Sequence, residues 1–146
     1  MKKTLLVDGN NLMKIGFHGV RDLFHENKHI GGIWHFLNTL RRFINEENFD
    51  KVVVFWDGED SSQPRKILYP QYKENRRSNF TDEQHLSFSE QRQRVKVYLE
   101  EMFVRQIECP QNEADDLIAY YCKISDRKST RLNSSHTDIS RMPSSA

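Results

Sequence analysis

The sequence predicts an α/β fold in which helices flank a parallel sheet. Three short apolar runs are typical of strands, and segments with helical spacing of apolar residues separate them. The runs cover residues 4–7, 52–56 and 106–109. Acidic residues follow each run, so the carboxyl ends of the strands would gather these acids at one edge of the sheet.

Length and composition limit the class of protein. A chain of 146 residues, of which 36% are hydrophobic, is long enough for one domain with a modest core. No apolar run is long enough to span a membrane, and Met1 leads directly into the first strand without a signal peptide. Cys109 and Cys122 lack metal-ligand spacing. We therefore expect buried, reduced thiols in a cytosolic protein.

The first predicted helix joins the first two strands. Its apolar residues recur at helical spacing over residues 33–44, and Gly31 and Gly32 mark its entry. The polar segment 61–88 has no clean period and is too long for an ordinary loop, so we expect it to be functional or mobile. Helical spacing returns over residues 88–103, and Asn112 is a candidate N-cap for a last helix that runs to Lys123.

The composition changes abruptly after Ser125. Residues 126–146 contain six Ser, three Arg and few apolar residues, which is typical of a flexible tail. Residues 126–136 are what a common sequencing adapter would encode, and residues 141–146 fit the continuation of that adapter. We therefore predict a natural segment, residues 1–125, followed by a disordered artefactual tail, residues 126–146, which replaces the rest of the domain.

Two of the predicted strands end in the same Asp-Gly pair. Asp8 precedes Gly9, and Asp57 precedes Gly58. Each pair alone is also typical of a simple turn, in which the glycine permits close approach of backbone or ligand. Two such pairs at strand ends within one small sheet favour a shared site over two unrelated turns.

A third acidic group opens the last predicted helix and contains Glu113, Asp115 and Asp116. Acids in a first helical turn also stabilise the helix dipole, so capping alone is the alternative. Glu113 and Asp116 are three residues apart and share a helix face that could look toward the sheet edge. Crowded carboxylates repel one another, and a hard divalent cation removes that repulsion. No Cys or His has zinc-ligand spacing, so we expect Mg²⁺ or Mn²⁺ bound by these three acids with Asp8 and Asp57.

A basic segment follows the strand that ends at Asp57. Tyr69 and Tyr72 are interleaved with its basic residues, which are Arg65, Lys66, Lys73, Arg76 and Arg77. Such a segment is either a solvated charged helix or a grip in which cations hold phosphates and tyrosines stack on unpaired bases. Beside a metal site the grip is favoured. It implies phosphodiester hydrolysis by a metal-activated water, with Lys or Arg stabilising the developing charge.

Two further pairs carry weaker signals. The backbone N–H groups of Gly31 and Gly32 are a candidate phosphate site at a helix entry, with a plain turn as the alternative. His25 and His29 are four residues apart, but they lie in a polar linker without carboxylate or Cys neighbours. We expect these histidines to be solvated.

Four motifs in order make the chain resemble the N-terminal part of the 5′ nuclease superfamily. They are Leu-Val-Asp-Gly-Asn-Asn-Leu at 6–12, Phe-Trp-Asp-Gly at 55–58, Leu-Tyr-Pro-Gln-Tyr-Lys-Glu-Asn-Arg at 68–76 with Arg65 before it, and Glu-Ala-Asp-Asp-Leu-Ile-Ala at 113–119. This superfamily, with its PIN-like parallel sheet, includes the 5′-3′ exonuclease domain of bacterial DNA polymerase I, phage 5′-exonucleases of the ribonuclease H type and flap endonucleases. The resemblance covers residues 3–124.

The resemblance implies a structure-specific 5′ nuclease that uses two magnesium ions to remove 5′ flaps, 5′ ends or RNA primers in replication and repair. Such a protein is expected to be a monomer in the cytoplasm of a bacterium or of a phage-infected cell. It places the five acids named above in the family's first metal group, and segment 61–88 becomes a helical arch around the 5′ end of DNA or of an RNA/DNA hybrid. The implied catalytic residues are Asp8, Asp57, Lys73, Arg76 and Asp116. The implied nucleic-acid contacts are Arg65, Tyr72, Lys73, Arg76 and Arg77, with Gly31 and Gly32.

The chain departs from the family pattern after its last helix. The family has further aspartates on the next strand, in an Asp-Lys-Asp-like motif, and then a helix-hairpin-helix module that binds duplex DNA. Neither follows here, so we expect a fold that is incomplete at the C-terminus and an impaired nuclease. A PIN-like ribonuclease and a noncatalytic nucleic-acid-binding fragment stay open as alternatives. A phosphoaspartate phosphatase fits less well, because Asn10 stands where that class has a second acid.

Overall fold

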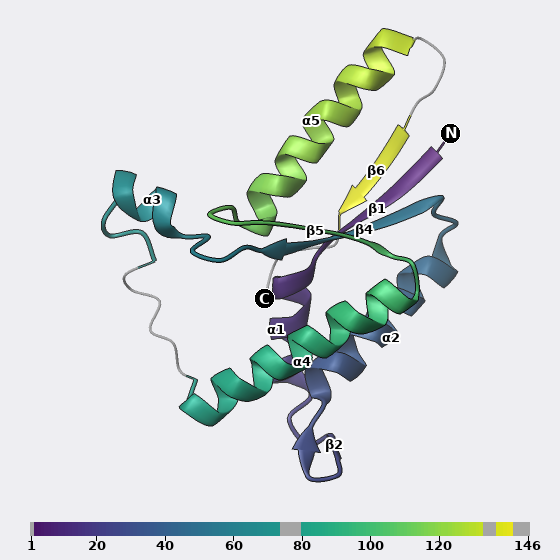
Figure 1. Ribbon diagram of the computed structural model, residues 1–146. Helices are drawn as coiled ribbons and strands as arrows, with labels where there is room; N and C mark the ends of the chain where they lie inside the picture. The colour runs from purple at the N-terminus through teal and green to yellow at the C-terminus, as the bar shows by residue number, and fades with distance from the viewer. Residues whose placement is uncertain (1, 74–79, 133–136, 142–146) are drawn as a thin grey trace.

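The structure is a computed structural model that describes residues 2–73, 80–132 and 137–141 (Figure 1). Its strands are β1 (Lys2–Asp8), β2 (Phe24–His25), β3 (Lys28–His29), β4 (Lys51–Asp57), β5 (Arg105–Cys109) and β6 (Thr137–Arg141). Its helices are α1 (Gly9–Gly19), α2 (Gly31–Glu46), α3 (Gln63–Leu68), α4 (Asp82–Glu101) and α5 (Ala114–Leu132). A parallel sheet flanked by helices is the fold class that the sequence predicts.

The main sheet has the strand order β5-β4-β1-β6, and all three pairings are parallel. The three predicted strands are β1, β4 and β5, each slightly longer than its apolar run. Asp8 lies opposite Phe55, and Asp57 lies opposite Cys109. The carboxyl ends of the three strands therefore meet at one edge of the sheet, as expected for parallel neighbours.

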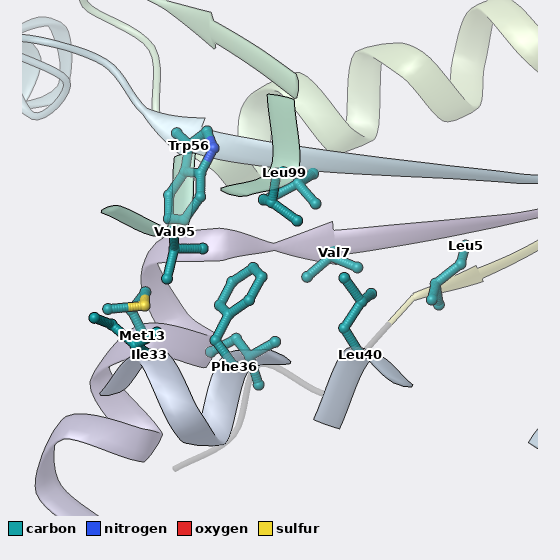
Figure 2. Packing of buried hydrophobic residues seen from close by; sticks show 11 residues of the cluster. Leu5, Val7, Met13, Ile33, Phe36, Leu40, Trp56, Val95 and Leu99 are labelled. Carbon is teal, nitrogen blue, oxygen red and sulfur yellow. The ribbon is translucent and has the colours of Figure 1, made fainter. Parts of the chain in front are cut away.

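Alternation along β1 and β4 sends apolar side chains to both faces of the sheet. On one face, Leu5, Val7 and Trp56 pack with side chains of α1, α2 and α4, including Phe36, whose ring stacks on Trp56 at 5.7 Å (Figure 2). On the other face, Leu6, Val53 and Phe55 pack against α5 through Ala114 and Ile118. Burial on both faces explains why the strand sequences are continuous apolar runs and not alternating ones.

The helix α1 was not predicted, because Gly9-Asn10-Asn11 after a strand is typical of a turn. Asp8 instead serves as the N-cap of this helix, and its Oδ1 accepts a hydrogen bond from the Asn11 N–H at 3.1 Å. Asp at this position satisfies one of the N–H groups that a helix start leaves unpaired. The simple turn, which was the alternative at Asp8 and Gly9, is therefore not what the structure contains, and the first crossover has two helices, α1 and α2.

Segment 61–88 is more regular than its sequence indicates. It contains α3, and α4 begins at Asp82, six residues before the predicted start. A capping box fixes this start: Thr81 Oγ1 accepts from the Gln84 N–H at 3.2 Å, and Gln84 Oε1 accepts from the Thr81 N–H at 2.9 Å. Residues 74–79, which include the predicted contacts Arg76 and Arg77, lie outside the described residues.

Parts of two described elements lie in the predicted tail, residues 126–146, whose disorder stays a prediction. Helix α5 continues to Leu132, and residues 137–141 form β6, which pairs in parallel with β1 from Lys2 to Leu6. An unpaired strand exposes a row of backbone N–H and C=O groups, and β6 satisfies one side of β1. The adapter-like origin of residues 126–146 stays a prediction.

A short antiparallel hairpin, β2 and β3, separates α1 from α2. His25 is exposed, as expected for a solvated histidine. The expectation for His29 was wrong, because its ring bonds to the Val20 carbonyl through Nε2 at 2.6 Å and to Gln91 through Nδ1 at 3.2 Å. Within the described ranges, neither Cys109 nor Cys122 forms a disulfide bond. None of the helices in the described ranges is long and apolar enough to cross a bilayer.

An ion pair joins α4 to the edge strand β5. Lys96 Nζ donates to Glu108 Oε2 at 2.6 Å, and Arg92 Nη2 lies 3.3 Å from Glu108 Oε1. Partial burial by itself raises the pKa of Glu108, but the hydrogen bond and charge of Lys96, with the charge of Arg92, outweigh burial and hold the pKa below its ordinary value of 4.5. The ion pair therefore contributes stability above pH 4.5, and this contribution is lost as the pH falls through the lowered pKa.

Glu108→Gln should lower the free energy of unfolding at pH 7 by at most about 1 kcal/mol, because the carboxylate is partly exposed and screened. The difference from wild type should shrink as the pH falls below 4.5, where the wild-type carboxylate becomes protonated. Urea unfolding at pH 7 and at pH 3 measures both values. Glu101→Gln, at the exposed end of α4, is the control and should change neither. A difference of equal size at both pH values would contradict the assigned role of Glu108.

Candidate active site

Asp8 and Asp57 lie at the carboxyl ends of neighbouring strands, β1 and β4. Asn10, in the first turn of α1, links the two ends, because its Oδ1 accepts a hydrogen bond from the Asp57 N–H at 3.1 Å. Asp8 is buried and Asp57 is half-buried. The predicted meeting of these two strand ends is thus present in the structure, and Asn10 is a linking residue that the sequence did not single out.

Each of the two aspartates accepts a hydrogen bond from a helix N-terminus. Asp8 caps α1, and Asp57 Oδ1 accepts from the N–H of Ala114, the first residue of α5, at 2.8 Å. The positive ends of the two helix dipoles attract the negative charge of these carboxylates. Because Ala114 follows Glu113, the contact also brings the start of α5 to the end of β4.

Glu113 and Asp116 face the same side of α5, as their spacing predicts, and Arg65 binds both of them. Arg65 Nη1 donates to Glu113 Oε2 at 2.7 Å, and Nη2 donates to Asp116 Oδ1. The Glu113 side chain is only 7% exposed, whereas Asp115 is exposed to solvent. Simple capping does not explain a buried glutamate that is held by a residue 48 positions away.

The predicted basic grip and the predicted acids lie together in the structure. Lys73 Nζ donates to Glu113 Oε1 at 2.7 Å. Tyr72 accepts from Arg65 Nη1 at 2.7 Å, and the cations of Arg65 and Lys73 lie 5.4 and 5.2 Å from its ring. Arg65 comes from α3, while Tyr72 and Lys73 follow that helix. Arg65, Tyr72 and Lys73 are therefore engaged with one another and with Glu113, and their binding of phosphates and bases stays a prediction.

The contacts among Arg65, Lys73 and Glu113 shift the pKa values of Glu113 and Arg65. Burial raises the pKa of Glu113, but the hydrogen bond from Lys73 and the charges of Lys73 and Arg65 outweigh it and hold the pKa below the ordinary value. The hydrogen bond with Tyr72 and the nearby charges of Glu113 and Asp116 raise the pKa of Arg65 despite partial burial. Glu113 and Arg65 are therefore both charged at neutral pH, and the Glu113 carboxylate is available as an anion.

We call the carboxylates of Asp8, Asp57, Glu113 and Asp116 the acidic edge. Among residues 2–73, 80–132 and 137–141, no three Asp, Glu, His or Cys side chains lie close enough together to form a ready metal-binding group. Two members of the acidic edge are instead neutralised by Arg65 and Lys73. Hard divalent cations prefer carboxylate oxygens as ligands, so the residues of the acidic edge suit such a cation.

The candidate phosphate site at Gly31 and Gly32 does not fit the structure. The N–H groups of Gly32 and Ile33 donate to Oε1 of the buried Gln91 at 2.9 and 3.2 Å. A Cβ on Gly31 would lie 1.8 Å from the Val20 carbonyl oxygen. These glycines therefore allow close packing at the start of α2, and a side chain from α4 already occupies its N–H donors.

A family model and solved structures match the chain. The family described as 5′-3′ exonuclease, N-terminal resolvase-like domain, matches residues 3–144, a range that runs past residue 125 into the adapter-like segment. No curated protein matches the chain. Bacteriophage T5 supplies the structural matches reported below.

The bacteriophage T5 protein co-crystallised with metal ions has a TM-score of 0.63 and 22% identity. The T5 5′-exonuclease with bound zinc ions has a TM-score of 0.66 and 21% identity. The T5 flap endonuclease in a pseudo-enzyme-product complex with DNA and metal ions has a TM-score of 0.60 and 22% identity. The matches cover 84%, 86% and 87% of this chain and 44%, 45% and 46% of those structures.

At these identities the structural matches establish a shared fold, and the chain spans a little under half the length of the T5 proteins. The family match rests on the sequence and extends over nearly the whole chain. The chain therefore belongs to the 5′-3′ exonuclease family and carries its N-terminal resolvase-like domain.

Proposed function

We propose that the protein is a metal-dependent 5′ nuclease that hydrolyses phosphodiester bonds at 5′ flaps or 5′ ends. The observation that carries this proposal is the contact between the acidic edge and the basic residues Arg65 and Lys73. A nuclease of this kind needs anionic ligands for its cations and cationic groups for the substrate phosphate at one place. The family match and the T5 structures with metal ions and with DNA support the same activity.

Asp8, Asp57, Glu113, Asp115 and Asp116 would hold Mg²⁺ or Mn²⁺, with two ions in the complete enzyme. Oxygen donors without His or Cys favour these hard cations over zinc. When bound, the ions supply Lewis-acid activation of the attacking water and of the phosphate. Asp57 is already oriented by its hydrogen bonds to Asn10 and Ala114, so ion binding requires little movement of its backbone.

The basic residues have two sets of partners in this proposal. Arg65 and Lys73 bind carboxylates in the described structure, where they offset the negative charge of the acidic edge. With cations held by the acids, the same guanidinium and ammonium groups would be available to bind the scissile phosphate and its developing charge. Tyr72, beside both of them, is placed to contact a base or sugar. Arg76 and Arg77 lie outside the described residues, and we propose from the sequence that they also bind nucleic acid.

The proposed substrate is DNA or an RNA/DNA hybrid with a free 5′ end, and the proposed roles are flap and primer removal in replication and repair. We propose that the protein acts on these substrates as a monomer in the cytoplasm. The sequence lacks the Asp-Lys-Asp-like motif of the family pattern. We therefore propose that this form of the enzyme turns over slowly.

Cleavage of a 5′-labelled flap DNA by excess protein tests the proposal. Slow cleavage near the junction is expected in Mg²⁺ or Mn²⁺, and none in EDTA. Plain single-stranded RNA is the comparison substrate, and faster cleavage of the RNA would favour a PIN-like ribonuclease. Binding of flap DNA that survives EDTA, with no cleavage in either metal, would instead identify a noncatalytic nucleic-acid-binding fragment.

A further inference from the structure

Arg92, on α4, contacts the main chain of a proposed metal ligand. Its Nη2 donates a hydrogen bond to the Asp57 carbonyl oxygen at 2.8 Å and lies 3.3 Å from Glu108 Oε1. Its guanidinium lies over the Trp56 ring, 5.4 Å from the centroid. Arg92 therefore contacts the last two residues of β4 and the partner strand β5 at once.

Trp56 is the platform for this arginine, and its position affects both strand ends. The ring is 1% exposed, and its Nε1 donates to Gln106 Oε1 at 2.8 Å. A Cβ on Gly9 would lie 2.6 Å from the ring, so the backbone that follows Asp8 packs directly against it. The ring thus lies between the cation of Arg92 and the start of α1.

Burying the Arg92 side chain leaves one of its donors unpaired, which indicates that its other hydrogen bonds have a specific role. Within the described part of the chain, Arg92 Nε is buried and has no hydrogen-bond partner. A buried donor without a partner is unfavourable, and an aliphatic side chain would avoid that penalty. What the guanidinium adds is a planar group that stacks on Trp56 while donating to the Asp57 carbonyl.

We infer that Arg92 is a positioning residue for the Asp57 carboxylate. The Asp57 peptide is held on its N–H side by Asn10 and on its carbonyl side by Arg92. With both sides fixed, the carboxylate points at the N–H of Ala114, the residue that follows Glu113. The positioning stands on these contacts, and its consequence for metal binding rests on the proposed function.

Lys96 provides a matched control. Its Nζ lies over the same Trp56 ring at 5.5 Å and bonds to the same Glu108 carboxylate, and its side chain makes no hydrogen bond to Asp57 among the described residues. Lys96→Met and Arg92→Met each remove one cation from the ring and one partner from Glu108. Only Arg92→Met removes the donor to the Asp57 carbonyl.

Hydrogen exchange of the Ala114 amide reports the Asp57 carboxylate without any metal. We expect Arg92→Met to speed this exchange about tenfold or more, which corresponds to loss of one charge-assisted hydrogen bond. Lys96→Met should leave it near wild type, and Arg92→Lys should lie between wild type and Arg92→Met. Unchanged exchange in Arg92→Met, or equal acceleration in Arg92→Met and Lys96→Met, would overturn the inference. If Arg92→Met does not fold, the Ala114 exchange rate is compared between Arg92→Lys and Lys96→Met. Faster exchange in Arg92→Lys supports the inference, and equal rates overturn it.

Manganese binding, followed by calorimetry, tests the consequence for the site. Arg92→Met should weaken binding of Mn²⁺ by about ten- to a hundredfold, the usual loss when a residue that orients a metal ligand is removed. Lys96→Met should bind as wild type does, and equal affinity in all three proteins would overturn the metal-site role. If wild type binds no Mn²⁺, the proposed function fails, and the Ala114 exchange still decides the positioning role.

Discussion

Replacing Asp57 with Asn is expected to abolish metal-dependent cleavage while leaving DNA binding largely intact. The amide keeps an oxygen that can accept the Ala114 N–H, so the start of α5 stays in place, but the negative charge that would bind a divalent cation is lost. The single-turnover rate on flap DNA should fall by more than about a hundredfold, beyond the loss caused by removing an outer-shell partner. Asp57→Ala should be equally inactive and also less stable, because the Ala114 N–H at the start of α5 loses its acceptor.

A second aspartate at the opposite end of the same strand provides the control. Asp50 precedes β4, and its Oδ2 accepts a hydrogen bond from the Lys3 N–H at 2.7 Å. Asp50→Asn removes the same charge far along the strand from the acidic edge and should cleave at the wild-type rate. Cleavage by Asp57→Asn at the wild-type rate would refute the metal-site assignment. DNA affinity is measured alongside by fluorescence anisotropy in the presence of Ca²⁺.

Gly58→Ala should cause the largest loss of stability among single-methyl additions at the active site. A Cβ on Gly58 would lie 1.8 Å from the Cys109 carbonyl oxygen and 2.5 Å from its carbon, so the backbone itself would have to move. The Gly58 N–H also donates to the Asn112 carbonyl at 3.0 Å. Forced separation of β4 from the loop before α5 should lower the free energy of unfolding by about 2 kcal/mol or more.

The same displacement should weaken the acidic edge, because Gly58 adjoins Asp57 and the Asn112 loop leads to Glu113. Gly19→Ala is the control: nothing lies within 4 Å of the added Cβ at the end of α1. That change should shift the free energy of unfolding by less than about 1 kcal/mol, and toward greater stability. Urea denaturation of both variants measures the difference. Equal stabilities of Gly58→Ala and wild type would show that Gly58 is not in close contact with the Cys109 backbone.

The sequence by itself determined the sheet and the position of its acids. Continuous apolar runs before Asp8 and Asp57 predicted buried parallel strands, because such strands bury both faces. Parallel strands place their carboxyl ends at one edge, so the location of these acids followed from the strand assignment alone. The three-residue spacing of Glu113 and Asp116 likewise predicted their common face, which Arg65 confirms by binding both.

The sequence was less informative where one short motif fits two structures. Asp-Gly after a strand is typical of a turn, and it is also a good N-cap followed by a helix, which is what Asp8 and Gly9 form. Gly31 and Gly32 were open to either a phosphate or a packing role. The structure favours the packing role, because the Gly32 N–H donates a hydrogen bond to Gln91, 59 residues further along the chain.

The tertiary structure alone decided which cations the acids meet. Arg65 and Lys73 reach Glu113 across 48 and 40 residues, and Arg92 reaches the Asp57 carbonyl across 35. Local propensity and periodicity describe the backbone and the face on which a side chain lies, but they carry no information about which distant side chain fills the space opposite. That choice depends on how α3, α4 and α5 pack against the sheet, because a hydrogen bond forms only when donor and acceptor approach within about 3 Å.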